Sequence, residues 1–322
     1  MTQKVVLTGG SGYVGTRLTQ VLVDAGFKVS ILVKNKCLAQ SGESVECKTI
    51  GDMCDVLDWK IHLNDADYVI HLAARAHIIK ESSNAPLDDF MKVNCDATVR
   101  LASCAATVGI RRFIYISTIG VLGNSNTSKN TFDNYSKYDP QDMYSISKMK
   151  AEIALKKIST STKMEVVIVR PPLVYGADAP GNFHRLMRLI DLGLPLPLGK
   201  LTSRKSMISL YNLCDLITKT IEAPLDRFNI LVATDGSNWT TAELVALIGK
   251  YMGNKRPIFS VPVPMLVIFA SIIGKRSEIF KLMSSLQIDG SKTKEILNWS
   301  PPFLPEDGIE QAVKAYLLHK RQ

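Results

Sequence analysis

The hydrophobic and polar positions near the start of the chain alternate between strand-like and helix-like spacing. Val5–Leu7 is a short apolar run that ends in a glycine-rich turn. Thr16–Ala25 follows with amphipathic helical spacing and stops at Gly26, and Lys28–Val33 is a second run rich in β-branched residues. Two parallel strands need a crossover connection, which is usually a helix. The pattern therefore predicts a βαβ unit at the start of the chain.

The same alternation continues through the next part of the chain. It predicts strands over Tyr68–Leu72, Phe113–Ser117 and Glu165–Val169, and a helix over Phe90–Ala106. Strands with few polar positions are typical of parallel sheets that are covered on both faces. Alternating strands and helices indicate a doubly wound sheet. The sequence therefore predicts a Rossmann-type α/β domain with a parallel sheet over residues 1–170.

The composition and the pattern of the sequence change after Arg170. Proline, glycine and leucine dominate and the regular alternation is lost. Asn229–Ala233 has the pattern of one more strand, which would return to the sheet. Thr240 with Glu243 three residues later forms a capping box, which predicts the start of a helix. We therefore predict a smaller, mainly α-helical substrate domain over residues 171–322, with the site in the cleft between the domains.

Three glycines separate the first predicted strand from the first predicted helix. Glycine lets the backbone turn tightly and approach a pyrophosphate closely, and the N-terminus of the helix offers free N–H groups and a positive dipole. This context predicts a dinucleotide site, whereas the alternative is an ordinary glycine-rich turn. The predicted contacts are Gly9, Gly12, Tyr13, Val14 and Gly15.

The end of the second predicted strand bears on the choice of cofactor. An NAD site usually places an acidic residue there to bind the ribose hydroxyls, but this sequence continues from Val33 into Lys34, Asn35 and Lys36. Lys34 is able to pair with a 2′-phosphate, so the sequence favours NADP over NAD. The alternative is that Lys34 faces solvent and that backbone groups alone hold the ribose.

A tyrosine and a lysine four residues apart supply candidate proton chemistry. Tyr144 and Lys148 lie in a stretch with helical spacing, so their side chains fall on one face. An ammonium near a phenol favours the phenolate and lowers its pKa from about 10 toward neutrality. Tyr144 is then a usable general acid or base. Ser117 and Thr118 close a predicted strand, where a hydroxyl can polarise a carbonyl. Such a tyrosine–lysine pair is common by chance, but here it accompanies the glycine turn.

Composition narrows the class of protein further. The chain has 322 residues, of which 46% are hydrophobic and 21% charged, with a formal net charge of +9, so it is neither disordered nor collagen-like. Its basic residues are scattered, so we expect no nucleic-acid partner. The six cysteines lack zinc spacing and are expected to be buried, unpaired small hydrophobes. We expect His71 to pack within its strand and no metal to bind.

No segment of the sequence predicts insertion into a membrane. The longest apolar run, Met265–Ile273, is much shorter than the roughly 20 residues that a membrane-spanning helix needs. The first residues lead directly into the predicted strand without the pattern of a signal peptide. A cytoplasmic protein is therefore expected.

Taken together, these motifs resemble extended short-chain dehydrogenase/reductases of the NAD-dependent epimerase/dehydratase family, whose members act largely on nucleotide sugars. The similar segments follow the family's order along the N-terminal half of the chain: Thr8–Gly15, Gly51-Asp52, His71–Ala74, Val93-Asn94, Ser117-Thr118, Tyr144–Lys148 and Arg170–Gly176. A weaker similarity continues through Gly181–Phe183, Arg204 and Asn298–Pro302.

The resemblance implies a role for each matching residue. Thr118 would hydrogen-bond the reacting oxygen, Tyr144 would transfer its proton, and Lys148 would also bind the nicotinamide ribose. Asn182 and Arg204 would hold the diphosphate of a UDP-sugar, the arginine through charge-assisted hydrogen bonds. The remaining implied contacts are Asp52 and Met53 at the adenine, Ala73 and Ala74 along the dinucleotide, Pro171 with Pro172 near the nicotinamide, and Asn94 as a brace for the active-site backbone.

The sequence favours one activity and leaves another open. Family dehydratases follow the catalytic threonine with an Asp-Glu pair, whereas Thr118 is followed by Ile119-Gly120, which disfavours 4,6-dehydration. The basic Lys34 and the missing second-strand acid favour reduction by NAD(P)H of the C4 ketone of a UDP-4-keto-6-deoxy-N-acetylhexosamine, in surface-polysaccharide synthesis. The alternative is an NAD-dependent nucleotide-sugar 4-epimerase that uses the same residues.

Two further expectations concern a non-catalytic function and the oligomeric state. A catalytically silent dinucleotide-binding scaffold would be expected to have lost Thr118, Tyr144 or Lys148, and all three are present. The family resemblance also implies a homodimer formed through the helices of Phe90–Ala106 and Tyr144–Leu155.

Overall fold

The structure is a computed structural model. It describes residues 2–35, 42–76, 86–127, 129–193, 201–253 and 283–321, together with the single residues 196, 199, 261, 262, 264, 265 and 271. Most of the apolar run Met265–Ile273, as well as Lys36 and Cys37, lies outside the described residues.

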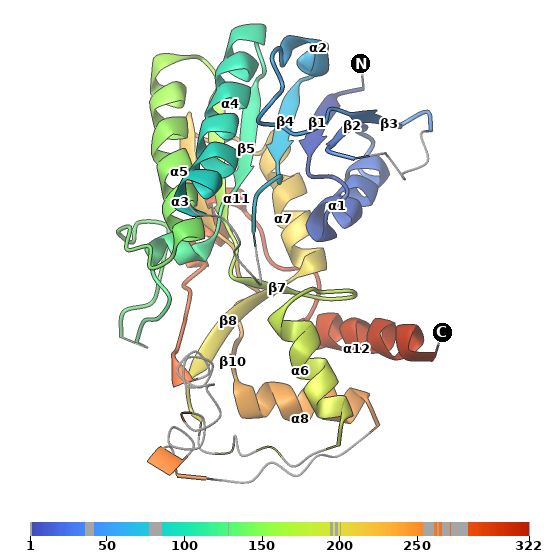
Figure 1. Ribbon diagram of the computed structural model, residues 1–322, viewed down its shortest axis with the longest axis vertical. Coiled ribbons are helices and arrows are strands. Elements are labelled where there is room, and N and C mark those ends of the chain that lie inside the picture. Colours follow the sequence, from blue (N-terminus) through green and yellow to red (C-terminus); the bar gives the residue numbers. More distant parts are fainter. Residues whose placement is uncertain are drawn as a thin grey trace.

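A parallel sheet of seven strands forms the upper part of the molecule (Figure 1). Its spatial order is β3-β2-β1-β4-β5-β6-β9, which confirms the predicted doubly wound fold. β9 pairs with β6 in parallel, as predicted for the strand that returns from the C-terminal part. In chain order the strands are β1 (Lys4–Thr8), β2 (Lys28–Val33), β3 (Val45–Thr49), β4 (Tyr68–His71), β5 (Arg112–Ile116), β6 (Glu165–Arg170) and β9 (Phe228–Val232).

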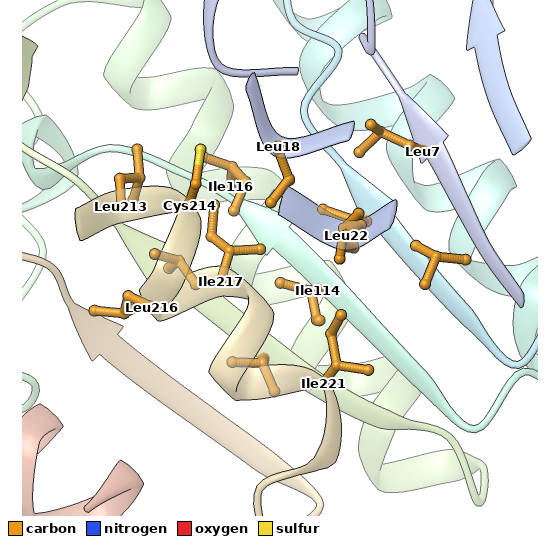
Figure 2. Packing of buried hydrophobic residues seen from close by; sticks show 14 of the residues in the cluster. Leu7, Leu18, Leu22, Ile114, Ile116, Leu213, Cys214, Leu216, Ile217 and Ile221 are labelled. Atoms are coloured by element: carbon orange, nitrogen blue, oxygen red, sulfur yellow. The ribbon is translucent and has the colours of Figure 1, made fainter. Parts of the chain in front are cut away.

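Helices cover both faces of this sheet. Along β1 the side chains alternate, so Val5 and Leu7 point to one face and Val6 to the other. The first face is covered by α1 (Tyr13–Asp24), α7 (Leu210–Glu222) and α11 (Ser291–Leu297), and the second by α2 (Lys60–Leu63), α4 (Ala97–Val108) and α5 (Met143–Ser161). Figure 2 shows leucine and isoleucine side chains of α1 and α7 packed against β1 and β5.

The predicted helix over Phe90–Ala106 is interrupted. It consists of α3 (Pro86–Met91), a π-helical turn over Lys92–Asp96, and α4, which ends at Gly109 in a left-handed conformation. Single π-turns inside helices are frequent at functional sites. Asn94 lies within this turn and is fully buried.

The C-terminal part is more than a set of helices. A three-stranded sheet with the order β10-β8-β7 lies below the large sheet, and it was not predicted (Figure 1). Its strands are β7 (Leu173–Tyr175), β8 (Arg204–Ser209) and β10 (Asn238–Thr240), and the helices beside them are α6 (Asn182–Asp191), α8 (Thr241–Tyr251) and α12 (Pro305–Arg321). The predicted capping box begins α8, because Thr240 Oγ1 accepts from Glu243 N at 3.1 Å. Within the described residues, no helix combines the length and apolar character needed to cross a membrane.

The cysteines follow the expectation only in part. Cys54, Cys95 and Cys214 are buried free thiols, and Cys104 is a half-buried one. Cys47 is instead disulfide-bonded, so the expectation of six unpaired thiols is wrong at this position. Cys47 lies on β3, an edge strand that the large core does not enclose on both sides.

The packing of α7 on the sheet leads to a prediction about stability. Ile217 of α7 is fully buried, whereas Leu57 is fully exposed. Ile217→Ala should reduce the free energy of unfolding by about 2–5 kcal/mol because it leaves a cavity between α7 and the sheet. Leu57→Ala, the control, should change it by about 0.5 kcal/mol or less. Urea denaturation of both variants measures the difference. Equal losses would contradict the packing of α7 against the sheet.

Candidate functional site

The carboxyl ends of the parallel strands bring the predicted site residues to one edge of the sheet. The turn after β1 contacts the segment after β4, because a Cβ placed on Gly9 would lie 2.7 Å from the backbone nitrogen of Ala73. The segments after β5 and β6 are joined by a hydrogen bond from Ile119 N to Pro171 O at 2.9 Å. Ligands of open α/β sheets bind at this edge.

The glycine turn has the geometry of a phosphate cradle. Gly9 has φ of +73°, and a Cβ on Gly15 would lie 2.6 Å from Gly10 Cα, so neither position tolerates a side chain. α1 begins at Tyr13, and its N-cap residue, Gly12, makes no side-chain cap. The first-turn N–H groups therefore lack intrahelical acceptors and suit an anion. These residues fit the pyrophosphate of a dinucleotide.

The edge beside this cradle differs from the prediction. Lys34 Nζ lies 2.6 Å from Asp52 Oδ2, and Asp52 Oδ1 accepts from Cys54 N at 2.9 Å. The hydrogen bond from Lys34 lowers the pKa of Asp52 to about 2, and the same contact raises the pKa of Lys34. A carboxylate therefore stands beside the end of β2, and the premise that none is available there is wrong. Asp52 follows β3, a strand that the sequence did not predict. Met53, next to it, is buried in the core.

Asn94 joins the segment after β4 to the helix that carries the tyrosine. Its side chain accepts from Arg75 N at 2.8 Å and donates to Arg75 O and Ser147 Oγ, both at 3.0 Å. Ser147 Oγ in turn donates to Tyr144 O at 2.7 Å. Asn94 thus braces the backbone on both sides of the site. Ala73 and Ala74 lie on the braced segment, with Ala74 exposed.

Thr118 begins a short turn at the end of β5. Its Oγ1 accepts from Gly120 N at 3.1 Å and caps the 3₁₀ turn Ile119–Leu122. The hydroxyl proton is left to donate to another group. Ile119, at the position where dehydratases carry an acid, is almost fully buried in an apolar cluster.

Tyr144 and Lys148 lie on the first turns of α5, as predicted. Asp142 caps the helix by accepting from Ser145 N at 2.8 Å. Lys148 is 1% exposed, and its Nζ donates to Ile116 O at 2.7 Å. The same Nζ lies 4.2 Å from the centroid of the Tyr115 ring and 6.0 Å from that of Tyr144.

The pKa values in this arrangement differ from the expected ones. Burial lowers the pKa of Lys148 to about 7, so near neutrality its amine is charged only part of the time. Burial, with a smaller contribution from Asp142, raises the pKa of Tyr144 to about 12. The prediction that Lys148 lowers the pKa of Tyr144 toward neutrality is therefore wrong for the protein without ligands. The desolvation of the phenolate outweighs the attraction of an ammonium at this distance.

The predicted substrate residues lie on the second sheet and its helices. Asn182 is exposed at the first position of α6. Arg204 donates to Asn238 O at 2.8 Å and is ion-paired with Glu243 at 3.1 Å, so a diphosphate would have to replace that carboxylate. Arg204 also lines a polar cavity of about 630 Å³ together with Ser125, Asn126, Ser285 and Gln287. Its neighbour Lys205, which sequence reasoning passed over, is half-buried, and burial lowers its pKa.

His71 has the packing role that was predicted. It is fully buried on β4, and its two ring nitrogens lie 2.6 Å from Thr8 Oγ1 and 2.8 Å from Thr98 Oγ1. Burial lowers its pKa to about 3, so the ring is neutral at physiological pH. The ring stacks on Tyr115, which in turn faces Lys148.

The doubly wound sheet, with a glycine turn after its first strand that fits a dinucleotide, defines a Rossmann-type protein. Residues 5–230 match the model of the NAD dependent epimerase/dehydratase family, and the chain belongs to this family. The chain is 35% identical over 321 residues to a UDP-glucose 4-epimerase of Vibrio cholerae, with 98% of this chain and 96% of the relative covered.

Two further similarities span the whole length of the chain. It is 25% identical, over 100% of this chain and 98% of the relative, to an N-acetyl-alpha-D-glucosaminyl-diphospho-ditrans,octacis-undecaprenol 4-epimerase of Escherichia coli O157:H7. The fold is similar to the crystal structure of a UDP-glucose 4-epimerase with UDP-glucose from Thermotoga maritima, with a TM-score of 0.80 and 18% identity. That similarity covers 99% of this chain and 100% of the other.

The buried Lys148 leads to a prediction about stability and pH. An unfolded lysine has a pKa of about 10.4, and in the fold burial lowers that of Lys148 to about 7. Between these values the unfolded chain binds the extra proton, so this group makes stability rise with pH. Relative to Lys148→Met, the wild type should therefore gain several kcal/mol between pH 7 and pH 10, because each pKa unit corresponds to about 1.4 kcal/mol.

Urea denaturation at a series of pH values tests this linkage. Lys150→Met, on the exposed side of the same helix, is the matched control for the loss of a lysine from α5. A difference in unfolding free energy between wild type and Lys148→Met that stays constant over this pH range would contradict the burial of an ionisable amine.

Proposed function

We propose that this protein is an NAD-dependent nucleotide-sugar 4-epimerase that acts on a UDP-linked hexose. The observation that carries the proposal is the Lys34–Asp52 ion pair at 2.6 Å. The pair has a carboxylate at the edge where a dinucleotide ribose is expected. That carboxylate compensates the positive charge of Lys34, the residue that favours NADP. The full-length similarity to a UDP-glucose 4-epimerase supports the same activity.

The proposed chemistry is a proton exchange at the sugar's 4-hydroxyl, coupled to a hydride transfer at C4. When bound, the cofactor supplies the hydride acceptor and donor. Tyr144 takes the proton of the 4-hydroxyl and later returns it. The hydroxyl of Thr118 donates a hydrogen bond to the same oxygen and so orients the ring. Lys148, when charged, stabilises the phenolate and also binds the nicotinamide ribose.

Inversion requires the sugar ring to present its other face, so the rest of the substrate has to stay bound. We assign that task to Asn182 and Arg204, which would hold the diphosphate while the ring turns. The other proposed contacts to the cofactor are Gly9, Gly12, Tyr13, Val14 and Gly15 at the pyrophosphate, Asp52, Met53 and Lys34 at the adenosine, and Ala73, Ala74, Asn94 and Pro171 farther along the dinucleotide.

We also propose that the protein is a homodimer formed through α3, α4 and α5. Leu87 of α3 and both Met143 and Ile153 of α5 are large apolar residues that are more than a third exposed. Such residues are unfavourable in water and suit a contact between subunits.

A 4-keto reductase is the second candidate. It is favoured by Lys34, whose side chain is 66% exposed and is free to turn from Asp52 toward a 2′-phosphate. In that case NADPH would be consumed by a UDP-4-keto-6-deoxy-N-acetylhexosamine, while Tyr144 protonates the new alkoxide. The same three residues serve both reactions, so the two candidates differ in whether the cofactor is used up.

Cofactor stoichiometry and turnover distinguish the two candidates. The purified protein should release close to one NAD(H) per chain on denaturation. It should interconvert UDP-glucose with UDP-galactose, or UDP-GlcNAc with UDP-GalNAc, without net change in reduced nicotinamide. Rapid oxidation of NADPH by the 4-keto sugar, with little NAD released from the protein, would overturn the epimerase in favour of the reductase.

Tyr144→Phe is the control for that experiment. It should lower kcat by roughly 10²–10⁴-fold, because it removes the proton-transfer group. The bound NAD and the unfolding midpoint should stay close to those of the wild type.

The ion pair beside the ribose leads to a prediction about cofactor preference. Asp52→Asn removes a carboxylate that would repel a 2′-phosphate, so NADPH binding should strengthen relative to NADH by about fivefold, or ~1 kcal/mol. Lys34→Gln should weaken NADPH binding selectively. Fluorescence titration of NADH and NADPH at low and high salt measures both ratios. An unchanged ratio in both variants would remove the pair from cofactor selection.

A further inference from the structure

A buried ion pair joins α5 to the end of β6, beside the candidate site. Glu152 of α5 is 0% exposed and Arg170, at the end of β6, is 1% exposed. Their closest atoms, Arg170 Nη2 and Glu152 Oε2, are 2.6 Å apart, and Arg170 Nε lies 3.2 Å from both carboxylate oxygens. Glu152 also accepts from Ser117 Oγ at 2.5 Å and from Tyr138 OH at 2.9 Å. One carboxylate therefore ties α5 to the ends of two strands and to the segment before the helix.

Two of these partners, Ser117 and Arg170, are next to residues of the candidate site. Ser117 precedes Thr118, and Arg170 precedes Pro171. Glu152 itself lies one helical turn after Lys148, so the two side chains fall on the same face of α5. A change at Glu152 therefore reaches the reacting groups without touching a substrate or cofactor.

The charge of Glu152 acts on Lys148. The groups facing Lys148 are Tyr115 on β5, Tyr144 on α5 and the neutral His71 on β4, with the backbone oxygen of Ile116 as hydrogen-bond acceptor. Among the described residues, Glu152 is the anion that raises the pKa of Lys148 and so opposes the effect of burial. Arg170 is the ion-pair partner of Glu152, at 2.6 Å.

A contribution to the stability of the fold does not by itself explain a buried ion pair at this position. Buried ion pairs are often no more stabilising than apolar residues of similar volume. Within the described part of the chain, Arg170 Nη1 is also buried without a hydrogen-bond partner, which reduces stability further. A buried pair that adds little stability but lies one turn from the catalytic lysine suggests another role.

We propose that Glu152 is a positioning residue whose buried carboxylate favours the charged form of Lys148, and that Arg170 and Ser117 hold this carboxylate in place. A protonated Lys148 is the form that stabilises the phenolate of Tyr144. The inference rests on the proposed function only for its activity readout, because the protonation of Lys148 can be followed through the stability of the fold.

The first experiment measures that protonation without any substrate. Glu152→Gln strands Arg170 without a counter-charge and is expected to destabilise the fold strongly, so it is paired with the double variant Glu152→Gln/Arg170→Met. The unfolding free energy is measured against pH in both backgrounds, each with and without Lys148→Met. The rise of stability that depends on Lys148 should begin about one pH unit lower in Glu152→Gln, because a nearby opposite charge has been removed. In the double variant the shift should have the same direction and be smaller, because the positive charge of Arg170 is removed as well.

The matched control is a second ion pair, which joins β5 to β6 and is partly buried. Arg112, almost fully buried at the start of β5, pairs with Glu165 at the start of β6 at 2.6 Å, at the opposite end of the sheet from the site. Glu165→Gln should destabilise the fold and leave the pH dependence due to Lys148 unchanged. If the Glu152 variants also leave it unchanged, Glu152 has only a structural role and the proposal is overturned.

The second experiment follows activity against pH. In Glu152→Gln/Arg170→Met the fall of kcat/KM at alkaline pH should move to lower pH, with kcat at neutral pH reduced more than KM is raised. An alkaline limb at the wild-type position would overturn the proposal. A complete lack of epimerase activity in the wild type would overturn the proposed function alone, because the stability experiment still decides the role of Glu152.

Discussion

Parallel pairing of β1, β4, β5 and β6 is the constraint on which the rest of the structure depends. Parallel strands all end at the same edge, so residues from four distant parts of the chain meet there: the glycine turn, Ala73, Thr118 and Pro171. The crossover helices needed for this pairing bury the strands on both faces. They also deliver the first turns of α5, with Tyr144 and Lys148, to that edge.

Burial determines the electrostatics of the site more than any one contact does. It lowers the pKa of Lys148 to about 7 and raises that of Tyr144 to about 12, so without a ligand the proton stays on the phenol. Neighbouring charges modify this starting point. Glu152 favours the ammonium of Lys148, and Asp142 disfavours the phenolate. Desolvation therefore sets most of the pKa shift of Lys148 and Tyr144, and the carboxylates of Glu152 and Asp142 change these pKa values by smaller amounts.

The ion pair between Lys34 and Asp52 changes the functional interpretation more than its strength suggests. An exposed pair contributes little to stability. Its importance lies in its position, because it puts both charges beside the end of β2, where cofactors with and without a 2′-phosphate differ. Asp52, which follows the unpredicted strand β3, therefore favours an epimerase over a reductase.

The chain's local patterns determined most of the architecture and the identity of the site's chemical groups. The apolar runs predicted six of the seven strands of the large sheet, and spacing alone placed Gly9 in the turn after β1 and both Tyr144 and Lys148 on α5. β3 was missed because it is an edge strand with exposed and half-buried residues, so no apolar run marks it. The three-stranded sheet was missed because its strands β7 and β10 are only three residues long.

Only the tertiary structure decided how these groups act on one another. The distance from Lys34 to Asp52, the pairing of Arg204 with Glu243, and the position of Glu152 between Ser117 and Arg170 each join residues far apart in sequence. Desolvation likewise depends on what covers a side chain, and the chain's local pattern does not contain that information. The sequence by itself determined which residues are available for catalysis. The fold decided the partners and the charge states of these residues, because partners and charge states depend on contacts that form only when distant segments pack together.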